Sequence, residues 1–377
     1  MTLTVVQILP SLETGGVERG TLEIGGGLVR RGHRSIVISG GGRMVAELTG
    51  AGSEHIALPV GKKSLSSLTL IPRLREILEE KHVDILHVRS RMPAWIAYLA
   101  WRGMDIRIRP GFITSVHGPY SVNPYSRIMT RGQRIIAISL FIRDYILSNF
   151  PRTDPARIVT IPRGIDPDRF PYGFRPDAAW MGAWRQELPR LEDRRILTLP
   201  ARLTRWKGQT DFLRIISELK KSVPNIHGLI VGAAHLSRRG YLAELKALAR
   251  GLDIDENISF LGHRDDLREI MCVSDLVLSL ATEPEAFGRA TLEALAMGVP
   301  VVACDHGGAG EVLRVLFPEG LFAPGDIAGG IALIRRFLVD CPRVAQHNPF
   351  LLDQMIRDTI AVYEELGVNT RAAPGAP

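Results

Sequence analysis

The sequence predicts an α/β protein made of two Rossmann-like units with parallel sheets. Short β-branched runs alternate with longer amphipathic segments along most of the 377 residues. This alternation pauses once, between Gly164 and Arg194, in a stretch rich in Pro, Asp and Arg, and then restarts with a fresh strand. Nearly unbroken apolar strands separated by helices are typical of parallel sheets that are covered on both faces.

The length agrees with this division. At roughly 100–200 residues per domain the chain forms two domains, and a hydrophobic content of 45% is enough for two cores. We expect an N-terminal domain over residues 1–165, a linker over 166–194 and a C-terminal domain over 195–348. A final helix over 349–366 is expected to pack back across the junction onto the first domain.

In the first half, helical patterns lie between six strand candidates. The expected strands are Thr4–Leu9, Ser35–Ser39, Val83–Val88, Phe112–Val116, Arg134–Ile138 and Arg157–Ile161. The expected helices are Val17–Arg31, Leu68–Lys81, Ala94–Arg102 and Leu140–Asn149.

The second half repeats the pattern with five strands. These are Arg195–Leu199, Gly228–Gly232, Ile258–Gly262, Asp275–Leu280 and Val299–Ala303. The helices expected between and after them are Gln209–Lys221, Tyr241–Arg250, Leu267–Cys272, Arg289–Met297 and Ile327–Val339.

The composition excludes several classes of protein. No mainly apolar stretch reaches the roughly 18–20 residues of a membrane span, and no basic region of a secretory signal precedes the first strand. Cys272, Cys304 and Cys341 are far apart and form no CxxC pair, so neither a disulfide framework nor a zinc cluster is expected. We therefore expect a soluble cytoplasmic protein.

The positive charge is concentrated in the first half of the chain. Residues 1–170 carry 23 basic and 14 acidic side chains, a net charge of +9, whereas the whole chain carries +7. A positive field favours an anionic partner such as a lipid headgroup, a phosphorylated sugar or nucleic acid. Surface arginines that serve only solubility would give the same net charge.

The segment PEAFGRATLEALAMG, Pro284–Gly298, carries the strongest site signal. Pro284 and Gly288 favour a loop that turns into a helix near Gly288–Arg289. The N–H groups at such a helix start attract a diphosphate. Glu285 and Glu293, eight positions apart, can each accept hydrogen bonds from sugar hydroxyls. A solvated helix face would carry a similar pair.

The segment LPARLTRWKGQTDFL, Leu199–Leu213, places two cations after the first strand of the second domain. Arg202 offers a planar fork and Lys207 a point charge, and together they could neutralise a pyrophosphate leaving group. Ordinary loop cations are the alternative explanation.

Two weaker signals lie in the first domain. The glycine turn at Gly15–Gly16 would let the backbone approach a ligand, or form a tight turn without one. His117 follows the strand FITSV, where its imidazole could hydrogen-bond a reacting sugar or move a proton. Neither G-x-G-x-x-G nor a Walker A loop is present, which excludes NAD and P-loop chemistry.

Taken together, these motifs resemble the large group 1 (family 4 type) of retaining glycosyltransferases with the GT-B fold, from about Val6 to Leu366. The glycine turn, the cation pair in ARLTRWKG and the E-x7-E pair carry part of the resemblance. The other matching segments are VHG at Val116–Gly118, IPRGID at Ile161–Asp166, FLGHRDDL at Phe260–Leu267 and HGGAGEVL at His306–Leu313.

The resemblance implies a role for each matching residue. Arg202 and Lys207 would hold the donor diphosphate, Glu293 the ribose and Glu285 the transferred sugar, while His117 would touch sugar hydroxyls near the anomeric carbon. His263–Arg264 would lie beside the nucleobase, and the backbone of Phe287–Arg289 would line sugar and phosphate. The implied donor-binding set is Gly15, Gly16, Arg202, Lys207, His263, Arg264, Glu285, Ala286, Phe287, Gly288, Arg289 and Glu293, and the implied catalytic residues are His117 and Glu285.

Three positions depart from the family pattern. Ala201 and Ala286 stand where Gly is usual, and Arg163 replaces the Asn of the common IPNG. These changes bear on the shape of the donor pocket more than on the chemistry.

The sequence thus predicts transfer of a hexose from a UDP or GDP sugar to a hydroxyl acceptor, with retained anomeric configuration and with neither metal nor cofactor. The basic first domain suggests an anionic glycolipid or saccharide acceptor, such as a lipopolysaccharide-core intermediate, and peripheral contact with the cytoplasmic face of the inner membrane. No nucleic-acid partner is expected, because no RNP-like motif or zinc module is present.

Three alternatives remain at this point. The pairs Asp253/Asp255 and Asp166/Asp168 could serve a metal-dependent transferase of the other major fold, although both lie in loops that favour turn chemistry. A nucleotide-sugar epimerase could use the same two-domain scaffold. A basic nucleic-acid-binding protein is the third.

Overall fold

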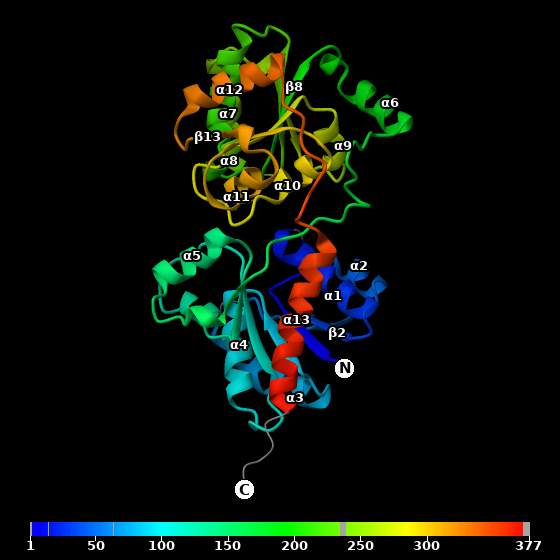
Figure 1. Cartoon of the computed structure of the whole chain (residues 1–377), viewed down its shortest axis with the longest axis vertical. Coiled ribbons are helices and arrows are strands. Elements are labelled where there is room, and N and C mark those ends of the chain that lie inside the picture. The colour runs from blue at the N-terminus through cyan, green and yellow to red at the C-terminus, as the bar shows by residue number, and fades with distance from the viewer. Residues whose placement is uncertain (1, 14, 63, 234–238, 372–377) are drawn as a thin grey trace. The chain divides into compact units, whose positions relative to one another are not determined.

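The computed structural model describes residues 2–371, except 14, 63 and 234–238. The chain divides into two compact units, Met1–Gly164 with Phe350–Pro377, and Ile165–Pro349 (Figure 1). Each unit is a parallel sheet with helices, as the alternation of strands and helices predicts. The sequence predicts a linker over residues 166–194. In the structure these residues belong to the second unit and include a helix.

The described part of the first unit has a seven-stranded parallel sheet in the order β3-β2-β1-β4-β5-β6-β7. The strands are β1 (Thr4–Ile8), β2 (Arg34–Ser39), β3 (Glu54–Ala57), β4 (Ile85–Val88), β5 (Gly111–Val116), β6 (Arg134–Ala137) and β7 (Ile158–Thr160). The helices are α1 (Gly16–Arg30), α2 (Val45–Gly50), α3 (Leu70–Glu80), α4 (Arg91–Arg102), α5 (Leu140–Asn149) and α13 (Leu352–Arg371). The chain order reverses between β1 and β4, the position at which such sheets bind ligands at their carboxyl edge.

Helix α13 returns from the end of the chain and packs on this first unit (Figure 1). Ile356 and Tyr363 are 1% and 0% exposed and belong to the same core cluster as Leu28 of α1. The close approach explains Gly27 within the glycine run of α1, because a Cβ there would lie 2.5 Å from Ile356 Cγ2.

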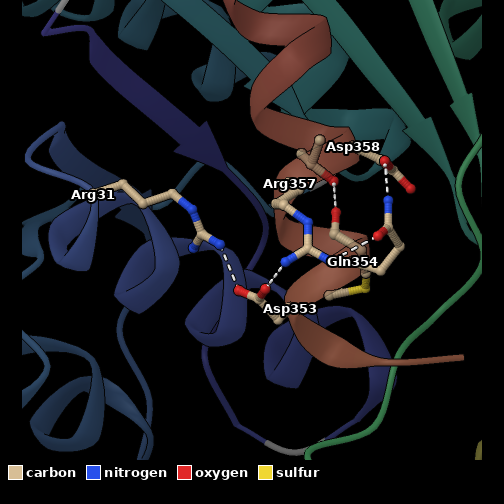
Figure 2. A network of polar contacts seen from close by, with 7 residues as sticks. Arg31, Asp353, Gln354, Arg357 and Asp358 are labelled. Carbon is tan, nitrogen blue, oxygen red and sulfur yellow. Dashed lines mark hydrogen bonds and ion pairs between the residues drawn. The ribbon is translucent and has the colours of Figure 1, made fainter.

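Polar contacts fasten the first turn of α13 to the end of α1 (Figure 2). Asp353 accepts from Arg31, which follows α1, and from Arg357 one turn further along α13. Arg357 also donates to Gln354 Oε1 at 2.7 Å, and Gln354 donates to Asp358 at 2.6 Å. These groups are exposed, so the buried apolar face of α13 contributes far more to stability than the ion pairs do.

The described part of the second unit has six parallel strands in the order β10-β9-β8-β11-β12-β13. The strands are β8 (Arg195–Pro200), β9 (Ile226–Val231), β10 (Ile258–Gly262), β11 (Leu276–Ser279), β12 (Val301–Cys304) and β13 (Leu321–Phe322). The helices are α6 (Ala178–Glu187), α7 (Gln209–Lys220), α8 (Arg239–Gly251), α9 (Leu267–Cys272), α10 (Arg289–Ala296), α11 (Gly307–Leu316) and α12 (Ile327–Val339). Here the order reverses between β8 and β11.

Helix α6 begins at Ala178 because the Asp177 side chain accepts a hydrogen bond from the Trp180 N–H. Its Trp184 is 5% exposed and packs with Leu191, Ile196 and Leu229 in one core cluster. This packing makes the segment part of the second unit. Among the described residues, every helix is too short or too polar to cross a bilayer.

Candidate functional site

The candidate site of the second unit lies where its strand order reverses. Strands β8 and β11 are neighbours in the sheet, so the loops that follow them meet at its carboxyl edge. The loop after β8 carries Arg202 and Lys207, and the loop after β11 carries Glu285 and leads into α10.

The two loops enclose a pocket of about 210 Å³. Both predicted cations line it, together with Glu285, Gly288 and Arg289 from the start of α10. Cationic side chains and a helix start on one cavity make an environment suited to an anion. Of the residues predicted between Glu285 and Glu293, Ala286, Phe287 and Glu293 do not line this pocket in the described structure.

Lys207 and Glu285 form an ion pair inside the pocket. Lys207 Nζ lies 2.8 Å from Glu285 Oε1, and the two side chains are only 15% and 18% exposed. The ammonium also lies 4.4 Å from the centre of the Trp206 ring, which holds it by a cation–π contact. Sequence spacing cannot show this contact, because it joins two loops that meet only in the folded sheet.

Left-handed glycines begin both helices beside the pocket. Gly208 precedes α7 with φ 76°, and Gly288 precedes α10 with φ 79°. A Cβ at Gly208 would lie 2.0 Å from Leu280 O, and one at Gly288 would lie 2.7 Å from Ala309 Cα. Because Gly288 has no side chain, this residue provides no side-chain cap for α10.

The turn at the start of α11 supports the Glu285 loop. The N–H of Gly308 donates to the Glu285 carbonyl at 2.7 Å, and the Nε2 atom of His306 lies 2.7 Å from the carbonyl oxygen of Ala281. A Cβ at Gly307 would lie 2.6 Å from the Glu285 carbonyl oxygen, so only glycine fits there. The predicted set of site residues contains no residue of this supporting turn. The adjacent glycines of HGGAGEVL are the feature of the sequence that indicates it.

Glu293 lies on α10 and pairs with Arg289. Arg289 Nε is 2.9 Å from Glu293 Oε1, an i,i+4 contact, and the Glu293 side chain is 16% exposed. The helix begins at Arg289, so Glu285 lies on the preceding loop and Glu293 on the helix. The loop-to-helix turn near Gly288–Arg289 is therefore where the sequence predicts it.

In the loop after β10, Arg264 forms ion pairs with carboxylates of the protein. Arg264 Nη2 is 2.8 Å from Asp266 Oδ2, and Arg264 Nη1 is 2.6 Å from Glu187 Oε1. These two carboxylates, Asp266 first, raise the pKa of the guanidinium. His263 Nε2 lies 3.2 Å from Asp265 Oδ1. In the described part of the chain, the lining of the 210 Å³ pocket includes neither His263 nor Arg264.

The predicted site residues of the first unit lie at the carboxyl edge of its sheet. Gly15 caps α1, and Gly16 is its first residue. His117 follows β5 and is half-buried, with Nδ1 3.0 Å from Arg163 Nη2. Burial, followed by the charges of Arg163 and Arg89, lowers the pKa of His117 well below its usual value. Its imidazole is therefore neutral at physiological pH.

Two parallel-sheet Rossmann-like units with an anion-suited pocket at a strand-order reversal are the architecture of GT-B glycosyltransferases. The family model "Glycosyltransferase Family 4" matches residues 14–169, and "Glycosyl transferases group 1" matches residues 181–346. The chain belongs to the group 1 glycosyltransferases, and the fold predicted from the sequence is confirmed.

A solved structure resembles the whole chain. The glycosyltransferase from Rickettsia africae ESF-5 is 29% identical with a TM-score of 0.86, and the match covers 97% of this chain and 98% of that one.

Two curated relatives match part of the chain. The N-acetyl-alpha-D-glucosaminyl L-malate synthase of Bacillus anthracis is 28% identical over 70% of this chain and 67% of its own length. The GDP-mannose-dependent alpha-(1-6)-phosphatidylinositol monomannoside mannosyltransferase of Mycolicibacterium smegmatis is 28% identical over 65% of this chain and 64% of its own length. The match thus spans about two thirds of these curated relatives.

Proposed function

We propose that the protein is a retaining hexosyltransferase that uses a nucleotide diphosphate sugar as donor and a hydroxyl group as acceptor. The observation that carries the proposal is the pocket in which Arg202, Lys207 and the start of α10 line one cavity. A leaving diphosphate gains negative charge as the glycosidic bond breaks, and fixed cations and helix N–H groups stabilise that charge without reorganising.

In this proposal the Lys207–Glu285 pair is opened by the donor. The diphosphate takes Lys207 as its counter-ion, and Glu285 then accepts hydrogen bonds from hydroxyls of the transferred sugar. The bond from the anomeric carbon to the diphosphate oxygen breaks with its electron pair on the diphosphate. The acceptor oxygen bonds to the same face of the sugar, and its proton passes to the departing diphosphate.

The other predicted residues complete the donor site. Glu293 binds the ribose, and the backbone of Phe287–Arg289 with Ala286 lines the sugar and phosphate. His263 and Arg264 flank the nucleobase. In the first unit, Gly15, Gly16 and His117 are the proposed ligand-contacting residues. The reaction needs no metal in this scheme because Arg202 and Lys207 supply the positive charge. Unchanged turnover with EDTA supports this point, and loss of turnover that Mn²⁺ restores contradicts it.

For the acceptor we propose an anionic glycolipid or saccharide of the cell envelope, reached at the inner membrane surface. The first half of the chain carries a net charge of +9. The first unit also has a pocket of about 590 Å³ whose lining includes Arg127, Arg131, Arg152 and Arg157. Arginines suit phosphate groups, since their planar forks bind two oxygens at once. The curated mycobacterial relative is itself named for a phosphatidylinositol mannoside.

A thermal-shift panel with UDP, GDP and ADP sugars tests the donor. We expect one nucleotide class to raise the melting temperature of the wild type and to raise it less in Glu293→Ala, which lacks the ribose contact. Glu319→Ala, a carboxylate outside the pocket, is the matched control. No shift with any nucleotide sugar contradicts the proposed function, and an equal shift in Glu293→Ala removes ribose binding from Glu293. An epimerised nucleotide sugar formed without acceptor would identify an epimerase instead.

A further inference from the structure

The imidazole of His117 is held by a group that can only donate hydrogen bonds. Arg163 lies just after β7, is 7% exposed, and places Nη2 3.0 Å from His117 Nδ1. A guanidinium carries five N–H donors and no acceptor at any accessible pH. The contact therefore requires a lone pair on Nδ1, and a neutral imidazole with a bare Nδ1 carries its proton on Nε2.

The surroundings of His117 oppose a second proton. The charged and titratable groups that face it are Arg163, Arg89 just after β4, His87 within β4, and Tyr120, whose hydroxyl accepts from the His117 backbone N–H at 3.4 Å. Arg89 is 2% exposed, and His87 already contacts the Tyr363 hydroxyl at 2.7 Å and the Ser115 hydroxyl at 2.6 Å. Two guanidinium charges close to the ring disfavour an imidazolium, so His117 stays neutral.

The other ring nitrogen of His117, Nε2, is available to a bound ligand. His117 Nε2 is buried and has no hydrogen-bond partner among them. An N–H donor left in that state is costly, because its hydrogen bonds to water are lost without replacement. A bound oxygen acceptor would satisfy it.

We propose that Arg163 is a positioning residue that fixes His117 as the neutral Nε2–H tautomer, so that His117 serves as a hydrogen-bond donor to an oxygen of a bound substrate and not as a general base. This inference rests on the proposed function for the identity of that oxygen. It also gives a structural reason for the arginine in IPRG, because the side chain at this position sets the proton on His117.

Helix α1 leaves room for this arrangement. A Cβ at Gly20 would lie 2.3 Å from Arg163 Nη1, so the guanidinium occupies the space above a residue that has no side chain. Gly20→Ala therefore displaces the guanidinium while both interacting side chains stay unaltered. Gly26→Ala is the matched control in the same helix, since its nearest neighbour is the Arg30 tip at 3.3 Å.

The first test reads the tautomer directly and needs no turnover. Long-range ¹H–¹⁵N correlation spectra of histidine-labelled protein show which ring nitrogen carries the proton, and His117→Gln identifies the signals. We expect the His117 proton on Nε2, with no titration between pH 5.5 and 8.5. A proton on Nδ1, or a cationic ring within this range, overturns the proposal even if the protein transfers sugars.

The second test links the tautomer to turnover. Arg163→Met and Gly20→Ala should let the His117 ring sample both tautomers and titrate nearer its usual pKa. We expect kcat to fall about tenfold, the effect of losing one hydrogen bond in the transition state, with little change in donor KM. We also expect kcat to become dependent on pH below pH 7. Arg163→Gln, which keeps an N–H donor, should recover part of the loss, and Gly26→Ala should behave as wild type.

These outcomes separate the two proposals. Wild-type kcat and pH profile retained in a folded Arg163→Met overturn the positioning role. Absence of any transfer by the wild-type protein overturns the proposed function, while the spectra still decide the tautomer.

Discussion

Lys207 Nζ lies 2.8 Å from Glu285 Oε1, with both side chains less than one fifth exposed. The pair joins the loop after β8 to the loop after β11, the two loops that enclose the anion-suited pocket. A lysine held in place by a carboxylate is ready for an incoming phosphate, but the carboxylate competes with that phosphate for the ammonium.

The two partners should therefore respond in opposite ways to neutral substitution. In the proposed function Lys207 is the counter-ion of the diphosphate, so Lys207→Met should lower nucleoside diphosphate affinity about 10–100-fold. Glu285→Gln frees Lys207, so the same affinity should hold or rise while sugar transfer falls. Titration calorimetry and initial rates measure the two effects. Lys221→Met breaks an exposed pair with Glu218 and should change neither quantity. Equal losses of affinity in both variants would contradict competition for Lys207.

The left-handed glycine at the start of α10 is expected to be intolerant of any side chain. Gly288→Ala places a Cβ 2.7 Å from Ala309 Cα at φ 79°, so the free energy of unfolding should fall by about 1–3 kcal/mol. Gly182→Ala adds a methyl group within α6 where no atom lies within 4 Å, and it should stabilise by about 0.5–1 kcal/mol. Urea unfolding of the two variants measures this contrast. A neutral Gly288→Ala would show that α10 begins in another conformation.

The stability of the second unit should depend on pH through His227. Burial, followed by the charges of Arg190 and Arg194, lowers the pKa of His227 to about 4. Because its unfolded pKa is about 6.5, the unfolded chain binds the extra proton first, and stability is full above pH 6.5 and lost as pH falls toward 4. The loss at pH 5.5 amounts to about 1.4 kcal/mol.

Urea unfolding at pH 7.5 and 5.5 measures this difference. His227→Gln should reduce it, and His347→Gln on the exposed surface should leave it unchanged. An unreduced difference in His227→Gln would assign the pH dependence to other groups.

Helix α13 should owe its place on the first unit to its apolar face. Ile356→Ala deletes a side chain that is 1% exposed and packed in the core cluster, at a cost of about 2–5 kcal/mol. Asp353→Asn disrupts the exposed contacts with Arg31 and Arg357 in Figure 2, at a cost of no more than about 1 kcal/mol. Protease sensitivity of the first unit should follow the same order, and a reversed order would mean that the ion pairs hold the helix.

Much of the fold follows from local pattern. The helices Leu267–Cys272 and Ile327–Val339 have the predicted bounds, because apolar spacing and flanking turns are encoded within each segment. Strand β3 and helix α2 were missed, since each is only four to six residues long and carries a weak period. Helix α6 was missed because the surrounding Pro, Asp and Arg residues resemble a linker.

The sequence predicts which loops carry the candidate site, but not how their side chains pair. Parallel strands bring the loops of Arg202 and Glu285 to one edge, and that follows from alternation alone. The pairing of Lys207 with Glu285, and of Arg163 with His117, depends on side-chain directions between segments 78 and 46 residues apart. Local periodicity contains no information on such directions.

The proposed function requires that a diphosphate binds between Arg202, Lys207 and the start of α10. Calorimetric titration of UDP and GDP, set beside uridine and guanosine, tests it on the wild type and on Arg202→Gln/Lys207→Gln. We expect one diphosphate to bind the wild type at least tenfold more tightly than its nucleoside, and the double variant to lose this advantage. A double variant that still prefers the diphosphate as strongly as the wild type would contradict it.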